Sequence, residues 1–437
     1  MARLAAVAVE WNLSLPQQSA EGRALATLRW LLAVAMAVSG AAIVTRAAAG
    51  PFHFLLNVNR PLVAEGVFAL AATLLLLTIR RDSRDAALQP APVSAAEVAA
   101  VLLLTAICLY PLLRFPLVCD EYVLAAHGRA MDWAAALSLF RHAAMDPFFR
   151  PLADLSLPLD AWWAGASPAG WHALGFALHL INTLLVFALA SALFGRRGLA
   201  FWAAALFGIH GSRPEAVAFL GRFDQLATLF VLAGLLLFDR YLRSDKANWL
   251  AASNAAMLAG LLSKESAYIF PLLAIVLVVW RGRADRRGLR ATLPFFAIMG
   301  AVFAYRWQVL GGIGGYADLS TGHPQILNIH MLALLKAMTM RLWGLLYFPI
   351  NWSYPAEWWL AAAMAAGCAG VGHLVWLSRG ERRALWFGAA FTMIASLPVA
   401  HMLLIGADLR GAAHLYLPSV GFCFLAAAAI AGVRREA

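Results

Sequence analysis

Charge is scarce in this sequence. Of its 437 residues only 13% are Asp, Glu, Lys or Arg, whereas 62% are hydrophobic. A soluble domain carries about 25% charged residues, so the composition excludes an ordinary soluble enzyme. Lysine is scarcer still, with Lys246, Lys264 and Lys336 as its only examples. The formal net charge of +11 therefore rests on arginine. In so apolar a chain it is explained by membrane topology and anionic lipid, and nucleic acid is not an expected partner.

Cysteine is also rare. The four cysteines are neither spaced as CxxC nor grouped with histidines, which argues against a zinc site or a disulfide framework. No small-residue cleavage site follows the first apolar run, so that run is expected to be a retained anchor rather than a cleaved signal peptide.

Long apolar runs are what the chain has in abundance. A membrane span needs roughly 20 apolar residues, and about a dozen runs approach that length, although several are short. They cover residues 25–44, 62–79, 98–113, 171–194, 199–209, 226–238, 249–262, 268–279, 292–309, 358–376, 385–404 and 415–433. The pattern predicts an all-α polytopic membrane protein of about 11–13 transmembrane helices, with interfacial helices in its extracytoplasmic loops. A proline-containing stretch at 90–92 divides it into an N-terminal two-span segment, 1–92, and a main transmembrane domain, 93–437.

Basic clusters between the runs suggest the topology. They lie at 80–84, 196–197, 240–246, 281–290, 379–383 and 434–435. Placing them all in the cytoplasm satisfies the positive-inside rule if both termini are cytoplasmic and residues 331–349 lie along the outer interface. A bacterial inner membrane is the expected location. The extracytoplasmic side then carries most of the remaining charged or polar residues of interest: Asp120, Glu121, Arg150, His210, Arg213, Glu215, Arg222, Asp224, Lys264, Glu265 and Arg410.

The first candidate for chemistry is the acidic pair Asp120-Glu121, which follows directly where an apolar run surfaces. A carboxylate there can accept the proton of a hydroxyl acceptor, and partial burial would raise its pKa toward the working range. The alternative is two solvated loop acids. A divalent metal stays open, but two acids without a further ligand give it little support.

Two other positions have equally ordinary alternatives. Arg150, within an aromatic and proline-rich stretch, suits bidentate phosphate binding, or it is an interfacial arginine that snorkels to water. His179 and Asn182 lie three residues apart on one face of an apolar helix, where polar side chains more often tie helices together than contact a ligand.

The densest cluster lies between residues 209 and 225. Arg213 and Arg222 can stabilise a phosphate leaving group, with Glu215 and Asp224 orienting them, or the group is a mutually neutralising ion-pair network. His210 opens the same cluster. Further along, Lys264 can contact a lipid phosphate or pair with its neighbour Glu265.

Several of these motifs recur together in one known family. In order they are Asp120-Glu121, Phe149-Arg150-Pro151-Leu152, His179-x-x-Asn182, His210-x-x-Arg213-x-Glu215, Gly221-Arg222-x-Asp224, Leu262-Ser263-Lys264-Glu265 and Leu415-Tyr416-Leu417-Pro418. Over residues 102–424 the chain resembles the GT-C glycosyltransferases. It is most similar to the membrane part of the protein O-mannosyltransferases, including the transmembrane and tetratricopeptide-repeat members, without the repeats.

The resemblance implies an inverting transfer of a sugar, mannose or a similar hexose, from a polyprenyl-phosphate donor to an extracytoplasmic hydroxyl, on protein Ser or Thr. It makes Asp120 the base and Glu121 its acidic partner. It makes four cations candidates for the donor phosphate: Arg150, Arg213, Arg222 and Lys264. The remaining polar residues support the site: His179, Asn182, His210, Glu215, Asp224, Glu265 and Arg410.

Other functions remain open at this stage. The acceptor can instead be a lipid or a cell-envelope glycan. A lipid or glycan transporter would hold its ionisable groups near the bilayer midplane, and a scaffold would pair off its outer charges without forming a site.

Overall fold

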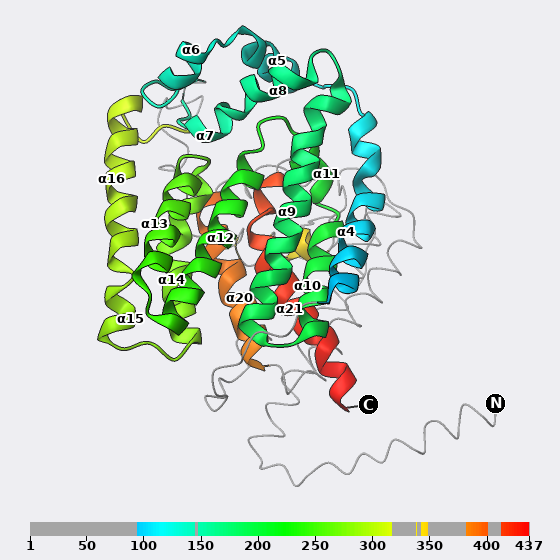
Figure 1. The fold of residues 1–437 in the computed structure, drawn as a ribbon, viewed down its shortest axis with the longest axis vertical. Helices are drawn as coiled ribbons and strands as arrows, with labels where there is room; N and C mark the ends of the chain where they lie inside the picture. Colours follow the sequence, from blue (N-terminus) through cyan, green and yellow to red (C-terminus); the bar gives the residue numbers. More distant parts are fainter. Residues whose placement is uncertain are drawn as a thin grey trace, which may run out of the picture.

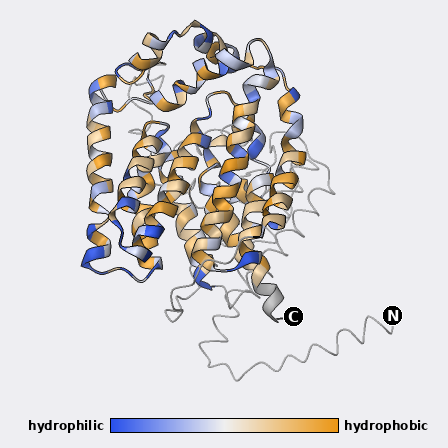
Figure 2. Cartoon of the chain, in the orientation of Figure 1, coloured by the Kyte–Doolittle hydropathy of each residue, from blue (hydrophilic) through white to orange (hydrophobic). Residues whose placement is uncertain are grey.

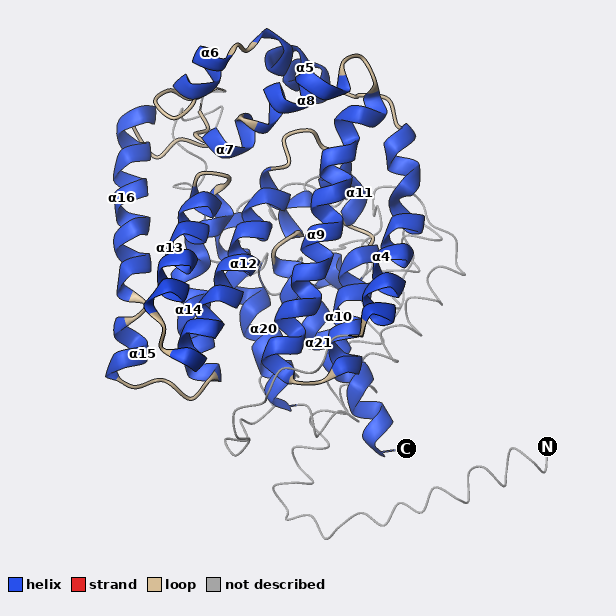
Figure 3. Ribbon diagram, viewed as in Figure 1, coloured by secondary structure: helices blue, strands red, loops and turns tan. Residues whose placement is uncertain are grey.

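The computed structural model describes residues 94–144, 147–316, 338, 342–347, 382–400 and 412–436. These residues form helices joined by short loops, with no strand in the part of the chain that they cover (Figure 3). The predicted all-α class is therefore confirmed. The predicted runs at 25–44, 62–79 and 358–376 and the residue Arg410 lie outside the described residues, as do 12 of the 19 residues in 331–349.

A bundle of long helices makes up the body of the protein (Figure 1). Its helices are α4 (Ala95–Leu109), α9 (Pro168–Phe194), α10 (Arg197–Ile209), α12 (Phe223–Ser244), α13 (Ala247–Leu261), α14 (Phe270–Trp280), α16 (Leu293–Leu310), α20 (Arg382–Ser396) and α21 (Pro418–Glu436). Short elements extend or join them: η1 (Tyr110–Arg114), α11 (Arg213–Ala218), η2 (Glu265–Ile269), α15 (Arg286–Arg290), α18 (Leu342–Tyr347), η6 (Leu397–Val399) and η8 (Ala412–Leu415). Each predicted apolar run within the described ranges coincides with one of these helices to within a turn or two, except that 385–404 continues beyond them.

Four short helices lie across one end of this bundle. They are α5 (Asp120–Ala130), α6 (Trp133–Ser138), α7 (Pro151–Asp154) and α8 (Ser156–Ala164), and they form a layer over the helix ends in Figure 1. The backbone N–H of Leu152 donates to the carbonyl of Leu262, 3.1 Å away, which fastens the layer to the loop after α13. We call this end of the bundle the capped end.

Several arginines lie at the opposite end of the bundle, which we call the basic end. Arg281 donates to the carbonyl of Ala192 at 2.7 Å, and Arg283 donates to that of Leu242 at 3.0 Å, so the turns after α9, α12 and α14 meet there. Arg383 donates to the carbonyl of Trp280 at the same end. Figure 2 shows hydrophilic residues gathered at α15 and the neighbouring turns. This basic end holds the described parts of the predicted clusters at 196–197, 240–246, 281–290 and 379–383.

The boundaries of the longest helix follow from its sequence. Ser167 precedes α9, and its hydroxyl accepts from Gly170 N–H at 3.3 Å, while Pro168 occupies the first helical position. Serine supplies the missing acceptor at a helix start, and proline there loses no hydrogen bond. The helix ends at Gly195, whose φ of 63° is left-handed, a conformation that glycine adopts at little cost.

Within the described residues, length and composition allow four helical segments to cross a membrane: Ala95–Arg114, Pro168–Phe194, Phe223–Ser244 and Arg286–Leu310. Three shorter apolar segments accompany them: Arg197–Ile209, Glu265–Trp280 and Pro418–Ala431. Together they support an integral membrane protein.

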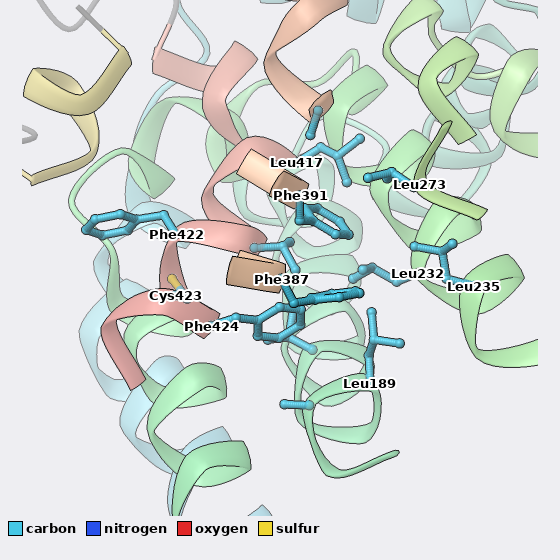
Figure 4. Close-up of a cluster of buried hydrophobic side chains, with 14 of the residues drawn as sticks. Leu189, Leu232, Leu235, Leu273, Phe387, Phe391, Leu417, Phe422, Cys423 and Phe424 are labelled. Carbon is cyan, nitrogen blue, oxygen red and sulfur yellow. The ribbon is translucent and has the colours of Figure 1, made fainter. Parts of the chain in front are cut away.

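The centre of the bundle is packed with aromatic rings. Phe387, Phe391 and Phe424 are fully or almost fully buried and gather with leucines of α9, α12 and α14 (Figure 4). Helices α20 and α21 approach closely because two glycines meet. A Cβ placed on Gly421 would lie 2.6 Å from the carbonyl oxygen of Gly388 and 2.5 Å from the amide nitrogen of Thr392.

Because Gly421 lies against Gly388, replacing it with alanine should lower the stability of the protein, whereas the same replacement at an uncrowded glycine should not. Gly421→Ala must push α20 and α21 apart, so we expect a loss of about 1–3 kcal/mol. Gly300→Ala in α16 meets nothing within 4 Å and should be neutral or stabilising by about 0.4–1 kcal/mol. Thermal unfolding of both variants in detergent measures the difference. Equal midpoints would contradict the close packing of α20 on α21.

Candidate functional site

The predicted acidic pair begins helix α5 of the cap. Asp120 is exposed, whereas Glu121 is buried and accepts a hydrogen bond from Val118 N–H at 2.8 Å. Cys119, in the turn that this hydrogen bond closes between Val118 and Glu121, has a φ of 48°. This backbone conformation costs energy for a residue with a Cβ. The folded-back Glu121 carboxylate stabilises this turn, and both acids face the positive end of the helix dipole.

Glu121 also connects the cap to the bundle. Burial raises the pKa of its carboxyl group above the ordinary value, while hydrogen bonds from the backbone of Val118 and Leu220 and the charges at His172 and Arg222 oppose the rise. Glu121 therefore lies beside the loop between α11 and α12, about a hundred residues later in the chain. The structure brings together the two stretches that the sequence left separate.

Arg222 forms the deepest contact between cap and bundle. Its guanidinium is paired with Asp160 of α8, and it donates to Trp171 O at 2.7 Å and to Ser156 Oγ at 3.2 Å. Both charged side chains are almost inaccessible, at 1% and 0% exposure. This placement favours the ion-pair alternative for Arg222 over direct contact with a ligand.

The first turn of α12 sends successive side chains to different partners. Arg222 has a left-handed φ of 49° and turns toward α8. Phe223 lies under Arg150, with 4.5 Å between its ring centroid and the guanidinium carbon. Asp224 pairs with Lys264, and Gln225 donates to Gly175 O of α9 at 2.9 Å. One turn thus joins the cap, the predicted phosphate residues and the longest helix.

The guanidinium group of Arg150 contacts two aromatic rings and one carboxylate. It stacks between Phe148 and Phe223, 4.3 and 4.5 Å from the two centroids. Its Nε and one terminal nitrogen donate to the same Glu265 oxygen, at 3.0 and 2.8 Å. The other Glu265 oxygen lies 3.0 Å from Arg306 of α16. The side chains of Arg150, Arg306 and Glu265 keep 13%, 10% and 25% exposure, so solvent reaches this triad.

Lys264 contacts a different acid from the one expected. Its ammonium donates to Asp224 at 2.6 Å and to His414 Nδ1 at 3.0 Å, while its neighbour Glu265 binds the two arginines. The alternation arises because Lys264 is extended, with φ −163° and ψ 154°, so successive side chains point in opposite directions.

Asp154 adds a titratable group to this region. It is buried in α7, and desolvation raises the pKa of its carboxyl group to about 7, with Arg150 opposing and Glu265 adding to the rise. When Asp154 is protonated, three cations (Arg150, Arg306 and Lys264) face two carboxylates. The region then has a net charge of +1 and can attract an anion.

His179 and Asn182 lie in the interior of the bundle. His179 Nδ1 is 2.6 Å from the Tyr416 hydroxyl, and its Nε2 is 2.9 Å from Gly208 O. Asn182 donates to Gln225 O at 2.9 Å and to the Tyr416 hydroxyl at 3.3 Å. These contacts tie α9, α10, α12 and the start of α21 together, as the structural alternative predicts.

Arg213 is buried next to this network. Its guanidinium carbon lies 4.2 Å from the Phe207 centroid and 4.7 Å from the Tyr416 centroid, and it donates to Phe207 O and to Ser419 Oγ. Within the described residues no carboxylate pairs with it. With an exposure of 0%, it has no open face for a donor phosphate and instead joins α10, α11 and α21.

The two remaining predicted residues in the described part of the chain, His210 and Glu215, each contact backbone of a distant segment. His210 Nε2 is 2.8 Å from Leu346 O, and its Nδ1 is 2.9 Å from Ser212 Oγ. Glu215 is exposed and accepts from Ala413 N–H at 2.9 Å. Both residues hold α11 against segments from the C-terminal third of the chain.

Sequence reasoning gave no role to four contributors: Asp154, Asp160, Arg306 and Tyr416. Tyr416 stands in the quoted motif Leu415-Tyr416-Leu417-Pro418, whereas the other three lie in none of the motifs. Arg306 gave a usable signal, because a charge inside an apolar run is rare unless it has a partner. The two aspartates lie in the polar loop region but in no motif. In the described part of the chain, no three His, Cys, Asp or Glu side chains converge on a position suited to a metal ion.

Breaking the buried pair of Arg222 and Asp160 should lower the free energy of unfolding by a large amount, and removing both charges together should restore much of it. Asp160→Ala leaves Arg222 charged and unpaired, so we expect a loss of about 3–5 kcal/mol and faster proteolysis within 115–167. The double variant Asp160→Leu/Arg222→Met removes both charges and should recover much of the loss. Glu97→Ala breaks the exposed pair with Arg197 and should cost about 0–1 kcal/mol. If Asp160→Ala behaved like Glu97→Ala, the cap would not depend on this pair.

Comparison with known proteins identifies relatives. The chain is 40% identical over 96 residues to protein O-mannosyl-transferase TMTC1 of Homo sapiens, covering 22% of this chain and 11% of that protein. It is 34% identical over 215 residues to protein O-mannosyl-transferase Tmtc2 of Drosophila melanogaster, covering 46% and 22%. With protein O-mannosyl-transferase TMTC4 of Homo sapiens it is 25% identical over 348 residues, covering 63% and 46%.

No family model matches the chain, and no solved structure matches it. The chain spans less than half the length of the relatives named above. The resemblance seen in the motifs is nevertheless confirmed, and the chain is related in sequence to the protein O-mannosyl-transferases.

Proposed function

We propose that this chain is a membrane glycosyltransferase of GT-C type that moves a sugar from a polyprenyl-phosphate donor to a hydroxyl acceptor at the capped end. The acceptor inferred from the relatives' name is protein, at Ser or Thr, and the sugar is mannose. The observation that carries the proposal is the joining of the Asp120-Glu121 turn to the Arg150–Glu265–Arg306 triad through the first turn of α12.

In this proposal Asp120 acts as the base. It is exposed at the start of α5, while its neighbour Glu121 is buried and holds the turn. The acceptor hydroxyl transfers its proton to the Asp120 carboxylate as its oxygen attacks the anomeric carbon. The bond from that carbon to the phosphate oxygen breaks, and a single displacement of this kind inverts the anomeric centre.

In this proposal Arg150 and Arg306 bind the phosphate. Both remain partly exposed and both are already oriented by Glu265, so neither has to reorganise when negative charge develops on the leaving group. Lys264 lies behind them and is paired with Asp224, where it contributes positive potential rather than direct contact. Arg213 and Arg222 support the site from within the protein.

The proposal includes an orientation. The capped end faces the extracytoplasmic side, where a lipid-linked donor meets its acceptor, and the basic end faces the cytoplasm in accord with the positive-inside rule. In a bacterium the membrane would be the inner membrane.

Asp120→Asn provides the test of the base. We expect the turnover number to fall by roughly 10²–10⁴-fold, with donor affinity unchanged, because the substitution removes the base and keeps the shape. The assay is transfer of radiolabelled mannose from polyprenyl-phosphate-mannose to a Ser/Thr-containing peptide by the protein in nanodiscs. Glu97→Gln, an acid at the far end of α4, is the control and should keep full activity. Full turnover by Asp120→Asn would refute the assignment, and transfer only to a lipid or glycan would change the acceptor.

The raised pKa of Asp154 leads us to expect that donor binding depends on pH. Its pKa of about 7 lies above the ordinary value of 3.8, so Asp154 ionises as the pH rises through 7 and cancels the net positive charge beside Arg150. We expect the donor dissociation constant to rise several-fold between pH 6 and pH 8. Asp154→Asn should bind with a flat profile and with the affinity that the wild type shows at low pH.

The same shift affects folding. Between pH 3.8 and about 7 the folded state holds a proton that the unfolded state has lost, so Asp154 lowers the free energy of unfolding as the pH rises through that window. Asp154→Asn removes this contribution and should be the more stable protein at pH 8. For donor binding, a wild-type dissociation constant that does not change between pH 6 and pH 8 would contradict the role given to Asp154.

A further inference from the structure

Positive charge at the basic end is concentrated at two adjacent turns. Residues 239–246 and 281–290 contain eight basic side chains and three acidic ones, a net charge of +5. The two turns are in direct contact. Arg281 is 2.5 Å from Asp239, Arg283 is 3.0 Å from Asp245, and Arg287 is 3.5 Å from the other Asp245 oxygen.

All three acids at these turns are already engaged. Asp239 is fully buried between Arg281 and Arg243, and Asp245 lies between Arg283 and Arg287. Asp285 caps α15 by accepting from Gly288 N–H at 2.7 Å. The acids therefore fix the geometry of the turns and leave the surplus charge in place.

The surplus lies on exposed side chains around α15. Arg286 and Arg290 are exposed, and no carboxylate among the described residues pairs with either. They are four residues apart, so they share one face of the helix. Two or more closely spaced guanidinium groups form a strong phosphate-binding surface.

Exposed leucines border this charged face. Leu289 of α15 is 42% exposed, and Leu293, the first residue of α16, is 60% exposed. A soluble anion has no apolar group to contact these leucines, whereas a phospholipid presents a phosphate and acyl chains together. The positive-inside rule alone requires neither the concentration of charge in these two turns nor the leucines beside it.

We propose that α15 and the turns packed against it form a binding site for an anionic phospholipid, with Arg286 and Arg290 on the headgroup phosphate and Leu289 and Leu293 along an acyl chain. Arg287 and Arg283 are ordered by Asp245 and border the same site. This site lies at the opposite end of the bundle from Asp120 and is independent of the proposed transferase activity.

Native mass spectrometry of the full chain in detergent tests the site. Phosphatidylglycerol should be retained on the wild type at concentrations where phosphatidylcholine is not. Arg286→Gln/Arg290→Gln should weaken its binding roughly tenfold or more, because each basic residue contributes on the order of 1 kcal/mol toward an anionic lipid. Both side chains are exposed, so size-exclusion profiles should not change.

Arg196→Gln/Arg197→Gln is the matched control, since it removes two positive charges from the same end but away from α15. It should leave phosphatidylglycerol binding within a factor of two of the wild type. Leu289→Ser/Leu293→Ser separates a lipid from a free phosphate, because it should weaken phosphatidylglycerol binding while binding of inorganic phosphate stays unchanged. Equal losses in the two arginine variants, or equal retention of both lipids, would overturn the proposal.

Discussion

The ion pair between Arg222 and Asp160 is the constraint on which the capped end depends. It joins α8 to the start of α12 inside a region from which water is excluded. It also holds Arg222 in a left-handed conformation, and this bend lets the next side chains reach other helices. Phe223 supports Arg150, Asp224 holds Lys264 and Gln225 binds α9. The geometry of the candidate site is thus set by a residue that is itself closed to ligand.

Burial divides the arginines of the capped end into two kinds. Arg213 and Arg222 are surrounded by carbonyl oxygens, hydroxyls and rings, and removing them from these partners would leave charge without solvation. Arg150 and Arg306 share one carboxylate and keep contact with solvent. An incoming phosphate can be added to the second kind without breaking the fold. Sequence motifs cannot make this division, because all four are arginines near helix ends.

Hydropathy was sufficient for the long helices of the bundle, but not for the short helices α5 to α8 of the cap or for the site. The run 171–194 predicts α9 closely because an apolar stretch in a membrane has few alternatives to a helix. The site depends on pairings between distant residues, such as His179 with Tyr416 or Arg150 with Glu265. Lys264 shows the limit of local reasoning, since its neighbour Glu265 was an expected partner. The extended backbone at Lys264 directs it to Asp224 instead.

The two ends of the bundle use charge in different ways. At the capped end, cations and carboxylates nearly balance, so a single proton on Asp154 decides whether the region around Arg150 is positive or neutral. At the basic end, the three acids of the two turns order the loops and leave a surplus that no carboxylate in the described part of the chain neutralises. A balanced region can respond to a transient substrate, whereas a standing surplus favours a lasting counter-charge. Membrane phosphate supplies that counter-charge wherever the bundle is embedded, so the same physical rule predicts a reaction site at one end and a lipid site at the other.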